Sequence, residues 1–449
     1  MTKILNRADN PRAWRVPAVW LGAERLRADA IIETTRGHIT AILEGSTGSA
    51  GRLDGIVLPG LVNAHSHAFH RLLRGRTHRQ GGDFWLWRTR MYEEAALLTP
   101  ESYEDIAAAV YMEMALAGIT TVGEFHYVHH QPGGVPYDDP NEMGHSLIRA
   151  ARRAGIRICL LDAGYFRSGF DEQEMHPLQI RFRDDSVDDW LDRVQDLATT
   201  YANDDDVVVG LAPHSVRAVP REGLSRVAEV VDESTPVHIH VSEQPTENQD
   251  CLEATGMTPV GLLETSGLLG PMTTLVHATH LSPEDVAAIG KSGSGVCYCA
   301  TTERDLADGL GPAAELHTAG AHLSVGSDSH AIIDLFEETR GIELHQRLLT
   351  GNRGVMEPRA LMDAATTGGS RTLGFGAEGL TEGAAADFVV IDLASPRLTG
   401  LDPTNIDGIV FAASAADVTD TFVGGDRIVA DRNHPGWDQA RPFLKPSHP

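Results

Sequence analysis

Short apolar runs alternate with amphipathic stretches between about residues 55 and 330 of the chain. The apolar runs are rich in β-branched residues and are bounded by Gly, Pro or Thr, which predicts buried strands separated by helices. Eight strands are predicted, at 55–65, 119–127, 156–165, 207–215, 235–243, 273–280, 295–302 and 322–330. Because strands and helices alternate, we expect a parallel (β/α)8 barrel of the TIM type.

The clearest helix is predicted at 100–118, where "TPES" is typical of a helix start and "AG" of a helix end. The two flanks of the chain have a different pattern, with hairpin-like pairs of short strands around "RGH" and "GGD". We expect both flanks to combine into one small β-sandwich beside the barrel. The predicted divisions are 1–57, 58–375 and 376–449, with a loose, proline-rich tail from residue 433.

The composition of the 449 residues, 42% hydrophobic and 22% charged, is that of a globular protein. No run approaches about 18 apolar residues, so no membrane span is predicted. The first residues contain no apolar segment of signal-peptide length, which favours a cytoplasmic location. The cysteines have no zinc-ribbon spacing, and we expect all four to be reduced thiols, most of them buried: Cys159, Cys251, Cys297 and Cys299.

The formal net charge is −26, which argues against binding to nucleic acid or to an anionic membrane surface. An anionic substrate would therefore need a local cationic pocket. Most basic residues are arginines, and the lysines are only Lys3, Lys291 and Lys445. A homodimer is the default expectation for the assembly.

Polar side chains with catalytic or metal-binding chemistry recur at the ends of the predicted strands. In a parallel barrel these ends meet on one face, which is where active sites lie. The residues at these ends are His65, His67, Glu124, His126, Tyr127, His214, Arg217, His238, His240, Glu243, His277, His280, Asp328 and His330.

Four of these residues form a plausible metal-ligand set: His65, His67, His240 and Asp328. A lone buried histidine is more often a hydrogen-bonded core residue, but three imidazoles and a carboxylate that converge on one axis suit a divalent ion such as zinc. A bound metal lowers the pKa of water and creates a nucleophile at neutral pH.

A general acid/base is then required. Glu243 lies three residues after His240, beyond the strand end, where it could face both the nucleophile and the substrate nitrogen. The alternative is a loop glutamate in a salt bridge. His277 could polarise the substrate or stabilise developing charge, or it could merely orient a neighbour.

The strings "PGLVNAHSH", "VHIHVSE", "LVHATH" and "VGSDSH" resemble the metal-site motifs of the amidohydrolase superfamily. The strings "FWLWRTRMY", "EFHYVHH", "PHSVRAV" and "HIHVSEQ" are similar, over about 200 residues, to the formimidoylglutamate deiminases within it. The barrel and the split β-sandwich are both part of this resemblance.

The resemblance implies that one zinc ion is held by His65, His67, His240 and Asp328, and that Glu243 and His277, with Asp328, move protons. It also implies that the substrate is held by Arg88, Tyr127, His214 and Arg217. The substrate would be N-formimino-L-glutamate, hydrolysed to N-formyl-L-glutamate and ammonia in histidine degradation. An arginine fork suits the carboxylates of this small anionic substrate.

One position departs from the family pattern, because His70 stands where these deiminases have a substrate-contacting glutamine. We assign His70 to the substrate wall, although its different length and tautomers leave open a related N-formimino or amidino acid as substrate.

Two-metal relatives use a carboxylated lysine on the fourth barrel strand, and 207–215 contains no lysine, so we expect one metal. A single-metal deaminase of a ring such as guanine is the nearest alternative, and a non-catalytic metal-binding protein on the same fold is a remote one.

Overall fold

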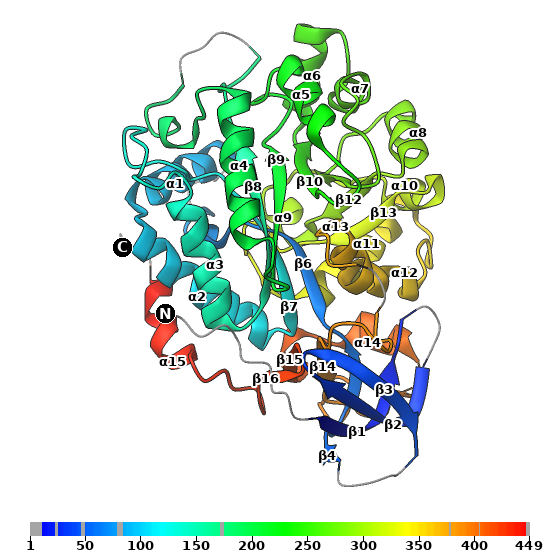
Figure 1. Cartoon of the computed structure of the whole chain (residues 1–449). Coiled ribbons are helices and arrows are strands. Elements are labelled where there is room, and N and C mark those ends of the chain that lie inside the picture. The colour runs from blue at the N-terminus through cyan, green and yellow to red at the C-terminus, as the bar shows by residue number, and fades with distance from the viewer. Residues whose placement is uncertain are drawn as a thin grey trace.

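The structure is a computed structural model that describes residues 11–22, 26–45, 50–78, 84–170, 175–376, 379–403 and 405–445. The chain forms a large parallel barrel with helices outside it and a smaller mixed sheet at one end of the barrel (Figure 1). The expected (β/α)8 architecture, with a second unit built from both ends of the chain, is confirmed.

Eight parallel strands follow one another around the barrel in chain order. The last strand returns to the first, where Asp328 N donates a hydrogen bond to His65 O at 3.0 Å. The strands are β6 (Leu61–Ser66), β7 (Ile119–His126), β8 (Arg157–Gly164), β9 (Val207–Pro213), β10 (Val237–Val241), β11 (Thr273–His277), β12 (Gly295–Tyr298) and β13 (His322–Val325).

Helices between the strands cover the outside of the barrel (Figure 1). The helix predicted at 100–118 is observed as α2 (Pro100–Leu116), in which Thr99 is the N-cap and forms a capping box with Ser102. The other helices of this layer are α1 (Phe84–Leu97), α3 (Glu142–Ala154), α4 (Val187–Tyr201), α5 (Arg221–Val230), α6 (Pro245–Thr255), α7 (Pro259–Thr265), α8 (Pro283–Ser292), α9 (Ala300–Asp305), α10 (Ala313–Ala319), α11 (Leu335–Thr350), α12 (Pro358–Asp363) and α13 (Gly369–Thr372).

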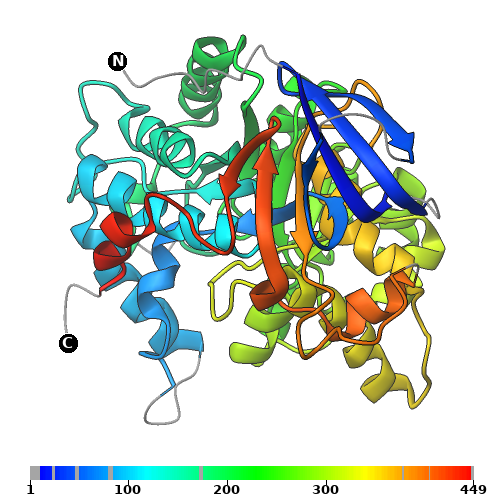
Figure 2. The same cartoon turned by 90° about the horizontal axis from the view of Figure 1, so that it is seen from below.

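Strands from both chain ends form the second sheet and lie side by side below the barrel (Figure 2). The sheet is curved around its own core. Trp14 of β1 and Phe422 of β15 show this, because their ring centres lie 5.3 Å apart although two strands, β14 and β5, lie between β1 and β15 in the sheet. Both predicted hairpins are present. The strands are β1 (Arg12–Trp20), β2 (Leu26–Thr35), β3 (His38–Glu44), β4 (Gly51–Arg52), β5 (Ile56–Pro59), β14 (Phe388–Ile391), β15 (Val418–Val423) and β16 (Asp426–Val429).

The single strand predicted at 55–65 is wrong in one respect, because the chain divides it between the two sheets. β5 pairs with β1 and β14, whereas β6 pairs with β7. The division falls at Gly60, where a Cβ atom would lie 2.2 Å from Thr120 Oγ1. Only glycine allows this close passage from one sheet to the other.

The prediction of a loose tail from residue 433 is also wrong for the part that the structure describes. The tail forms α15 (Trp437–Ala440) and a 3₁₀ helix at Arg441–Leu444. His434 Nε2 donates to Ala154 O at 3.0 Å, which ties the tail to the end of α3. Before it, α14 (Ile406–Ala412) is held to α11 by hydrogen bonds from Arg340 to the carbonyls of Phe411 and Ala413.

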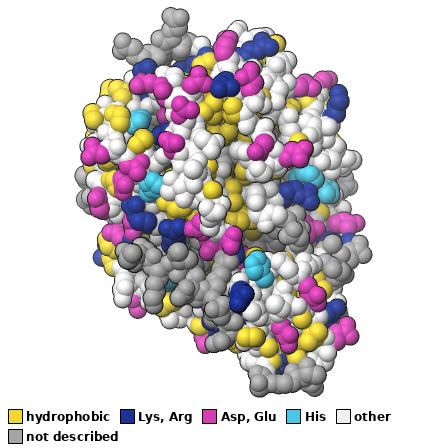
Figure 3. Space-filling view, in the orientation of Figure 1, with side chains coloured by type: hydrophobic (Ala, Val, Ile, Leu, Met, Phe, Trp, Pro, Cys, Tyr) yellow, Lys and Arg dark blue, Asp and Glu magenta, His cyan; other side chains and the backbone are white. Residues whose placement is uncertain are grey.

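The four cysteines are unpaired, as predicted, and all of them are buried. None of the helices in the described part of the chain combines the length and the apolar content needed to cross a bilayer. Acidic side chains are spread over the face shown in Figure 3, in keeping with the net charge of −26.

Candidate functional site

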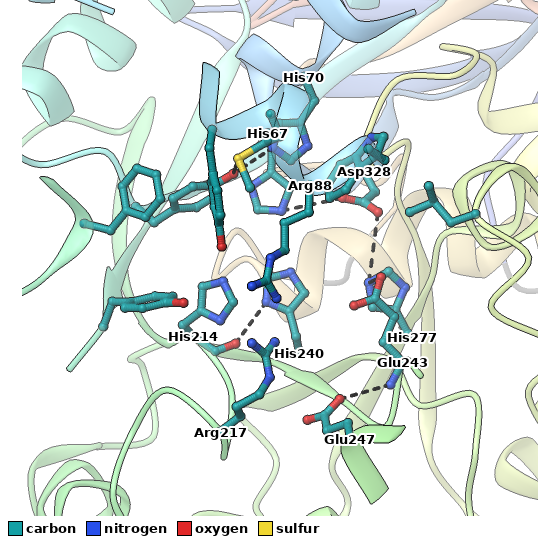
Figure 4. A pocket seen from close by; sticks show the side chains of 17 residues that line it. His67, His70, Arg88, His214, Arg217, His240, Glu243, Glu247, His277 and Asp328 are labelled. Atoms are coloured by element: carbon teal, nitrogen blue, oxygen red, sulfur yellow. Dashed lines mark hydrogen bonds and ion pairs between the residues drawn. The ribbon is translucent and has the colours of Figure 1, made fainter. Parts of the chain in front are cut away.

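The carboxyl ends of the barrel strands surround a cavity with an empty volume of about 720 Å³, part of it open to solvent. Every residue predicted to touch substrate or to move protons lines it, and His65 lies buried beside it. The lining consists of His67, His70, Trp87, Arg88, Met91, Tyr92, Tyr127, Tyr165, Phe182, His214, Arg217, His240, Glu243, Glu247, His277, Leu306 and Asp328 (Figure 4).

The four predicted metal ligands come together at the floor of this cavity. His65 Nε2 lies 3.2 Å from His240 Nε2 and 3.5 Å from Asp328 Oδ1. His67 Nε2 also lies 3.5 Å from Asp328 Oδ1. One ligand atom from each of the three histidines lies within 4.8 Å of the others, and all four side chains are buried.

The hydrogen bonds of two of these rings fix where their protons are. His67 Nδ1 donates to Phe125 O and His240 Nδ1 donates to His214 O, each at 2.9 Å. A carbonyl can only accept, so in the neutral ring each Nε2 keeps a lone pair that faces the cluster. Burial lowers the pKa of His65, His67 and His240 well below the ordinary value, which favours the neutral form that a metal requires.

This donor set fits a divalent cation. Lone pairs of His67 and His240 and a carboxylate oxygen of Asp328 converge, and His65 Nε2 lies among them. Such a group is electrostatically unfavourable without a positive charge at its centre. The cluster is therefore a buried, histidine-rich metal-binding site.

The backbone at the strand ends is held in unusual conformations. His277 and Asp328 have φ values of 69° and 43°. A non-glycine residue in this region costs on the order of 1–3 kcal/mol and persists where surrounding contacts enforce it, often at functional sites. Asp328 is held by hydrogen bonds to the backbone of β6, and the close approach needs Gly326, where a Cβ atom would lie 2.8 Å from His65 N.

Glu243 and His277 lie together beside the cluster. His277 Nε2 lies 3.8 Å from Glu243 Oε1 and 4.0 Å from Asp328 Oδ2. Burial raises the pKa of Glu243, while the nearby His277 opposes this shift. Burial acts to lower the pKa of His277, but the carboxylates of Glu243, Glu303 and Asp328 outweigh it, so that this pKa is raised well above its ordinary value. The arrangement can hold and move a proton.

The opposite wall carries the predicted substrate-binding residues. His70 Nε2 and Tyr127 Oη are 2.7 Å apart and form a hydrogen bond. Figure 4 shows the guanidinium groups of Arg88 and Arg217 directed toward the same part of the cavity, with His214 beside them. The Arg88 guanidinium lies 5.5 Å from the centre of the Tyr92 ring.

The Arg217 guanidinium forms no hydrogen bond or ion pair within the described ranges, so its donors are available to a ligand in the cavity. Burial acts to lower its pKa, but Tyr165 and Glu247 help to raise it. The two guanidinium groups thus place positive charge inside the cavity of a protein whose net charge is −26.

Sequence reasoning missed two carboxylates near the site. Glu247 lies one helical turn after Glu243 and lines the cavity, and its Oε2 accepts a hydrogen bond from Glu243 N at 3.3 Å. Glu303 follows β12 and lies 3.5 Å from His277 Nδ1. The i, i+4 spacing after Glu243 was a usable signal for Glu247. The sequence around Glu303 gave no signal of a role, because Glu303 comes close to His277 only when the barrel folds.

A second group of potential ligands, His126, His129 and Asp162, lies beside α4 and belongs to a hydrogen-bonded network. Arg193 donates to Asp162 Oδ2 at 2.7 Å and to His129 Nδ1 at 3.2 Å. His129 Nε2 donates to Ala163 O at 2.8 Å. Both ring nitrogens of His129 are therefore engaged, and the guanidinium already supplies the positive charge.

The sequence matches the Amidohydrolase family over residues 56–428. The chain belongs to this family. This amidohydrolase is 37% identical over 414 residues to formimidoylglutamate deiminase from Pseudomonas aeruginosa, a match that covers 90% of this chain and 91% of that protein. It is 30% identical over 393 residues to 8-oxoguanine deaminase from the same organism, covering 86% and 84% of the two chains.

The fold of this amidohydrolase also matches the crystal structure of an amidohydrolase from Brucella melitensis. The TM-score is 0.90 at 34% identity, and the match covers 96% of this chain and 98% of the other. Together, the family and the site make the chain a metal-dependent hydrolase that acts on carbon–nitrogen bonds. The remote alternative of a non-catalytic metal-binding protein is therefore set aside.

Proposed function

We propose that this amidohydrolase is a zinc-dependent deiminase that hydrolyses N-formimino-L-glutamate to N-formyl-L-glutamate and ammonia, a reaction of histidine degradation. The observation that carries the proposal is the entry of Arg88 and Arg217 into one cavity whose far side holds Glu243 and His277 next to the metal cluster (Figure 4). The 37% identity to a formimidoylglutamate deiminase supports the same substrate.

Zinc suits the donor set, because imidazole nitrogens and carboxylate oxygens are among the ligands that this ion takes in proteins. His65, His67, His240 and Asp328 would hold it. When bound, such an ion supplies a Lewis acid and makes water nucleophilic near neutral pH. We propose one ion per chain, since β9 has the sequence VVVGLAP and offers no lysine to bridge a second.

The chain's own residues would perform the remaining tasks. Arg88 and Arg217 bind the two carboxylates, and Tyr127 and His214 line the space between them and the cluster. Water adds to the formimino carbon, and Glu243 accepts its proton, with Asp328 beside it. Glu243 then delivers this proton to the terminal nitrogen and takes up the proton of the hydroxyl group that has formed on the carbon. As the carbon–oxygen double bond forms, this second proton passes to the same nitrogen, the carbon–nitrogen bond breaks, and ammonia leaves. His277 Nε2 donates a hydrogen bond to the oxygen on the reacting carbon, where negative charge develops.

His70 would form part of the substrate wall. Its Nε2 is engaged by Tyr127, and its buried Nδ1 has no partner among the described residues. The ring therefore has one nitrogen left for a substrate atom. A histidine extends a shorter distance into the cavity than a glutamine would. Related N-formimino or amidino acids should therefore also be tested as substrates.

A ring deaminase is the second candidate, and a specific observation favours it. The cavity has aromatic side chains suited to stacking on a planar ring: Trp87, Tyr92, Tyr165 and Phe182. The similarity to an 8-oxoguanine deaminase points the same way. Two arginines facing the cavity favour the dicarboxylate over an uncharged ring.

The deciding experiment measures ammonia release by the zinc-loaded enzyme from N-formimino-L-glutamate, N-formimino-L-aspartate, guanine and 8-oxoguanine. We expect the highest kcat/KM with N-formimino-L-glutamate. A higher kcat/KM with either purine would replace the proposal by the ring deaminase. The homodimer and the cytoplasmic location stay predictions from the sequence.

A further inference from the structure

Glu303 is a buried carboxyl group that the proposed reaction leaves without a task. It lies in α9 and is 3% exposed. Its Oε1 accepts a hydrogen bond from Cys299 N at 2.9 Å, which fixes the side chain against the start of the helix. The same oxygen lies 3.5 Å from His277 Nδ1. Glu303 Oε1 thus lies between the backbone N–H of Cys299 and the ring of His277.

The His277 ring lies between two sets of carboxylates. Its Nε2 faces the cavity, where it lies 3.8 Å from Glu243 and 4.0 Å from Asp328. On the other side, Nδ1 has no hydrogen-bond partner of normal geometry among the described residues, and Glu303 Oε1 is the acceptor within ion-pair distance. Hydrogen bonds of catalytic groups are often long before a substrate binds and tighten when it does.

Polar groups line a second, small cavity that Glu303 also borders. This cavity has room for about one water molecule, and its lining includes Tyr298, His345 and Gln346. Tyr298 Oη, His345 Nε2 and Gln346 Oε1 are all buried without a partner among the described residues. Three such groups in the lining make this a polar cavity, so Glu303 has polar neighbours besides His277.

We propose that Glu303 is a positioning residue for His277. It accepts the Nδ1 proton, sets the rotation of the ring, and keeps Nε2 directed at the substrate and at Glu243. A histidine whose second nitrogen is not fixed can adopt the wrong tautomer or turn away, and the loss then appears in the chemical step. The kinetic part of the proposal rests on the proposed deiminase function, whereas the ring geometry does not.

The chain offers a matched control in Glu338, a buried acid of α11. Glu338 Oε2 accepts from Thr301 N at 2.9 Å, so it also stabilises the start of α9. No contact with His277 is found for it within the described residues. Substitution of Glu338 therefore reproduces the structural loss without the proposed positioning loss.

The experiment compares Glu303→Leu, Glu303→Gln and Glu338→Gln as zinc-loaded enzymes. Glu303→Leu should lower kcat on the order of 100-fold, with KM and zinc content close to wild type. Glu303→Gln should retain kcat within about tenfold, because Cys299 N still orients its carbonyl oxygen toward Nδ1. Glu338→Gln should lower the melting temperature but change kcat by less than about twofold.

A second measurement needs no substrate. In protein labelled with ¹⁵N-histidine, the His277 signal is identified by its loss in His277→Asn. Its Nδ1 proton should shift upfield in Glu303→Gln, vanish by exchange in Glu303→Leu, and stay in place in Glu338→Gln. If no tested compound is turned over, the deiminase function fails, and this signal alone decides the proposal. An unchanged signal, an unchanged kcat in Glu303→Leu, or equal kcat losses in Glu303→Leu and Glu338→Gln would overturn it.

Discussion

His277 Nε2 lies 3.8 Å from Glu243 Oε1, at the point where β10 and β11 end side by side in the barrel. Val241 and His277 are register partners on the two parallel strands, which places Glu243 two residues beyond the pair. The acid and the imidazole thus meet because of the register between these two strands.

Glu243→Gln should lower kcat by about 10²- to 10⁴-fold, because a glutamine cannot accept or deliver the proton. Metal content measured by mass spectrometry should equal that of wild type, since Glu243 is outside the ligand set. Glu253→Gln, on the exposed face of α6, is the control and should have no effect. Turnover of Glu243→Gln at the wild-type rate would remove the acid/base role.

His240→Asn should lose most of the bound zinc and at least about a thousandfold of the activity, because one of the converging nitrogens is gone. His238→Asn is the control on the same strand. The His238 ring instead bonds Thr372 O at 3.0 Å, away from the cluster. Metal analysis after dialysis should give about one equivalent for this control. Full zinc occupancy in His240→Asn, or two equivalents in wild type, would contradict the ligand assignment or the metal count.

Arg217→Met should raise KM for N-formimino-L-glutamate about 10- to 100-fold, since hydrogen bonds to charged groups contribute about 1.5–3 kcal/mol. Uncharged ring compounds should bind no more weakly than to wild type. The exposed Arg226, which pairs with Asp188 and Glu229, provides the control Arg226→Met. Equal weakening for charged and uncharged ligands would show that Arg217 acts on the fold and not on the substrate's charge.

Glu247 should make substrate binding depend on pH. Burial raises its pKa to about 7, with Arg217 opposing the shift. Below this pH the side chain is neutral, and above it a negative charge faces Arg217 and competes with the substrate carboxylate. KM for an anionic substrate should therefore rise as the pH passes upward through about 7. In Glu247→Gln this rise should be absent, and a rise of the same size in the variant would assign it to another group.

Arg157 joins the barrel to the small sheet. This arginine, 4% exposed, ion-pairs with Asp206 beside the barrel and with Asp387 before β14, each at 2.6 Å. Arg157→Met should lower the free energy of unfolding by about 3–5 kcal/mol, because it leaves a partly buried carboxylate unpaired. Arg153→Met, which breaks more exposed pairs with Glu104 and Asp105, should cost about 1 kcal/mol or less by denaturant titration.

The barrel and the meeting of the histidines at its strand ends could be predicted because their signals are local and repeated. His65 and His67 directly follow an apolar run, and a parallel barrel requires such strand ends to meet. The path at Gly60 could not be predicted in this way. Residues 55–62 form one continuous apolar run, so the sequence does not show that the chain leaves one sheet at Gly60, close to Thr120, and enters the other.

The remaining errors share a cause. The tail from residue 433 is held by His434, which bonds Ala154 of α3 280 positions earlier, and by Gly436, which lies beside Met112 of α2. Glu303 acquires its position near His277 from the register of β11 and β12. Proline content and spacing carry no information on such distant contacts, so composition favoured a loop for the tail and left Glu303 unassigned.

The ligand cluster also coincides with the seam of the barrel. His65 belongs to the first strand and His67 directly follows it, while Asp328 follows the last strand. Asn63 Nδ2 donates to Ser327 Oγ across the same junction, 264 positions away. A cation bound there would add a link between the first and last strands to the hydrogen bonds that already join them, so metal binding would also stabilise the closed barrel. Protein from which the metal has been removed should then be cleaved by proteases first near β6 and β13, while the other pairs of neighbouring strands are still protected.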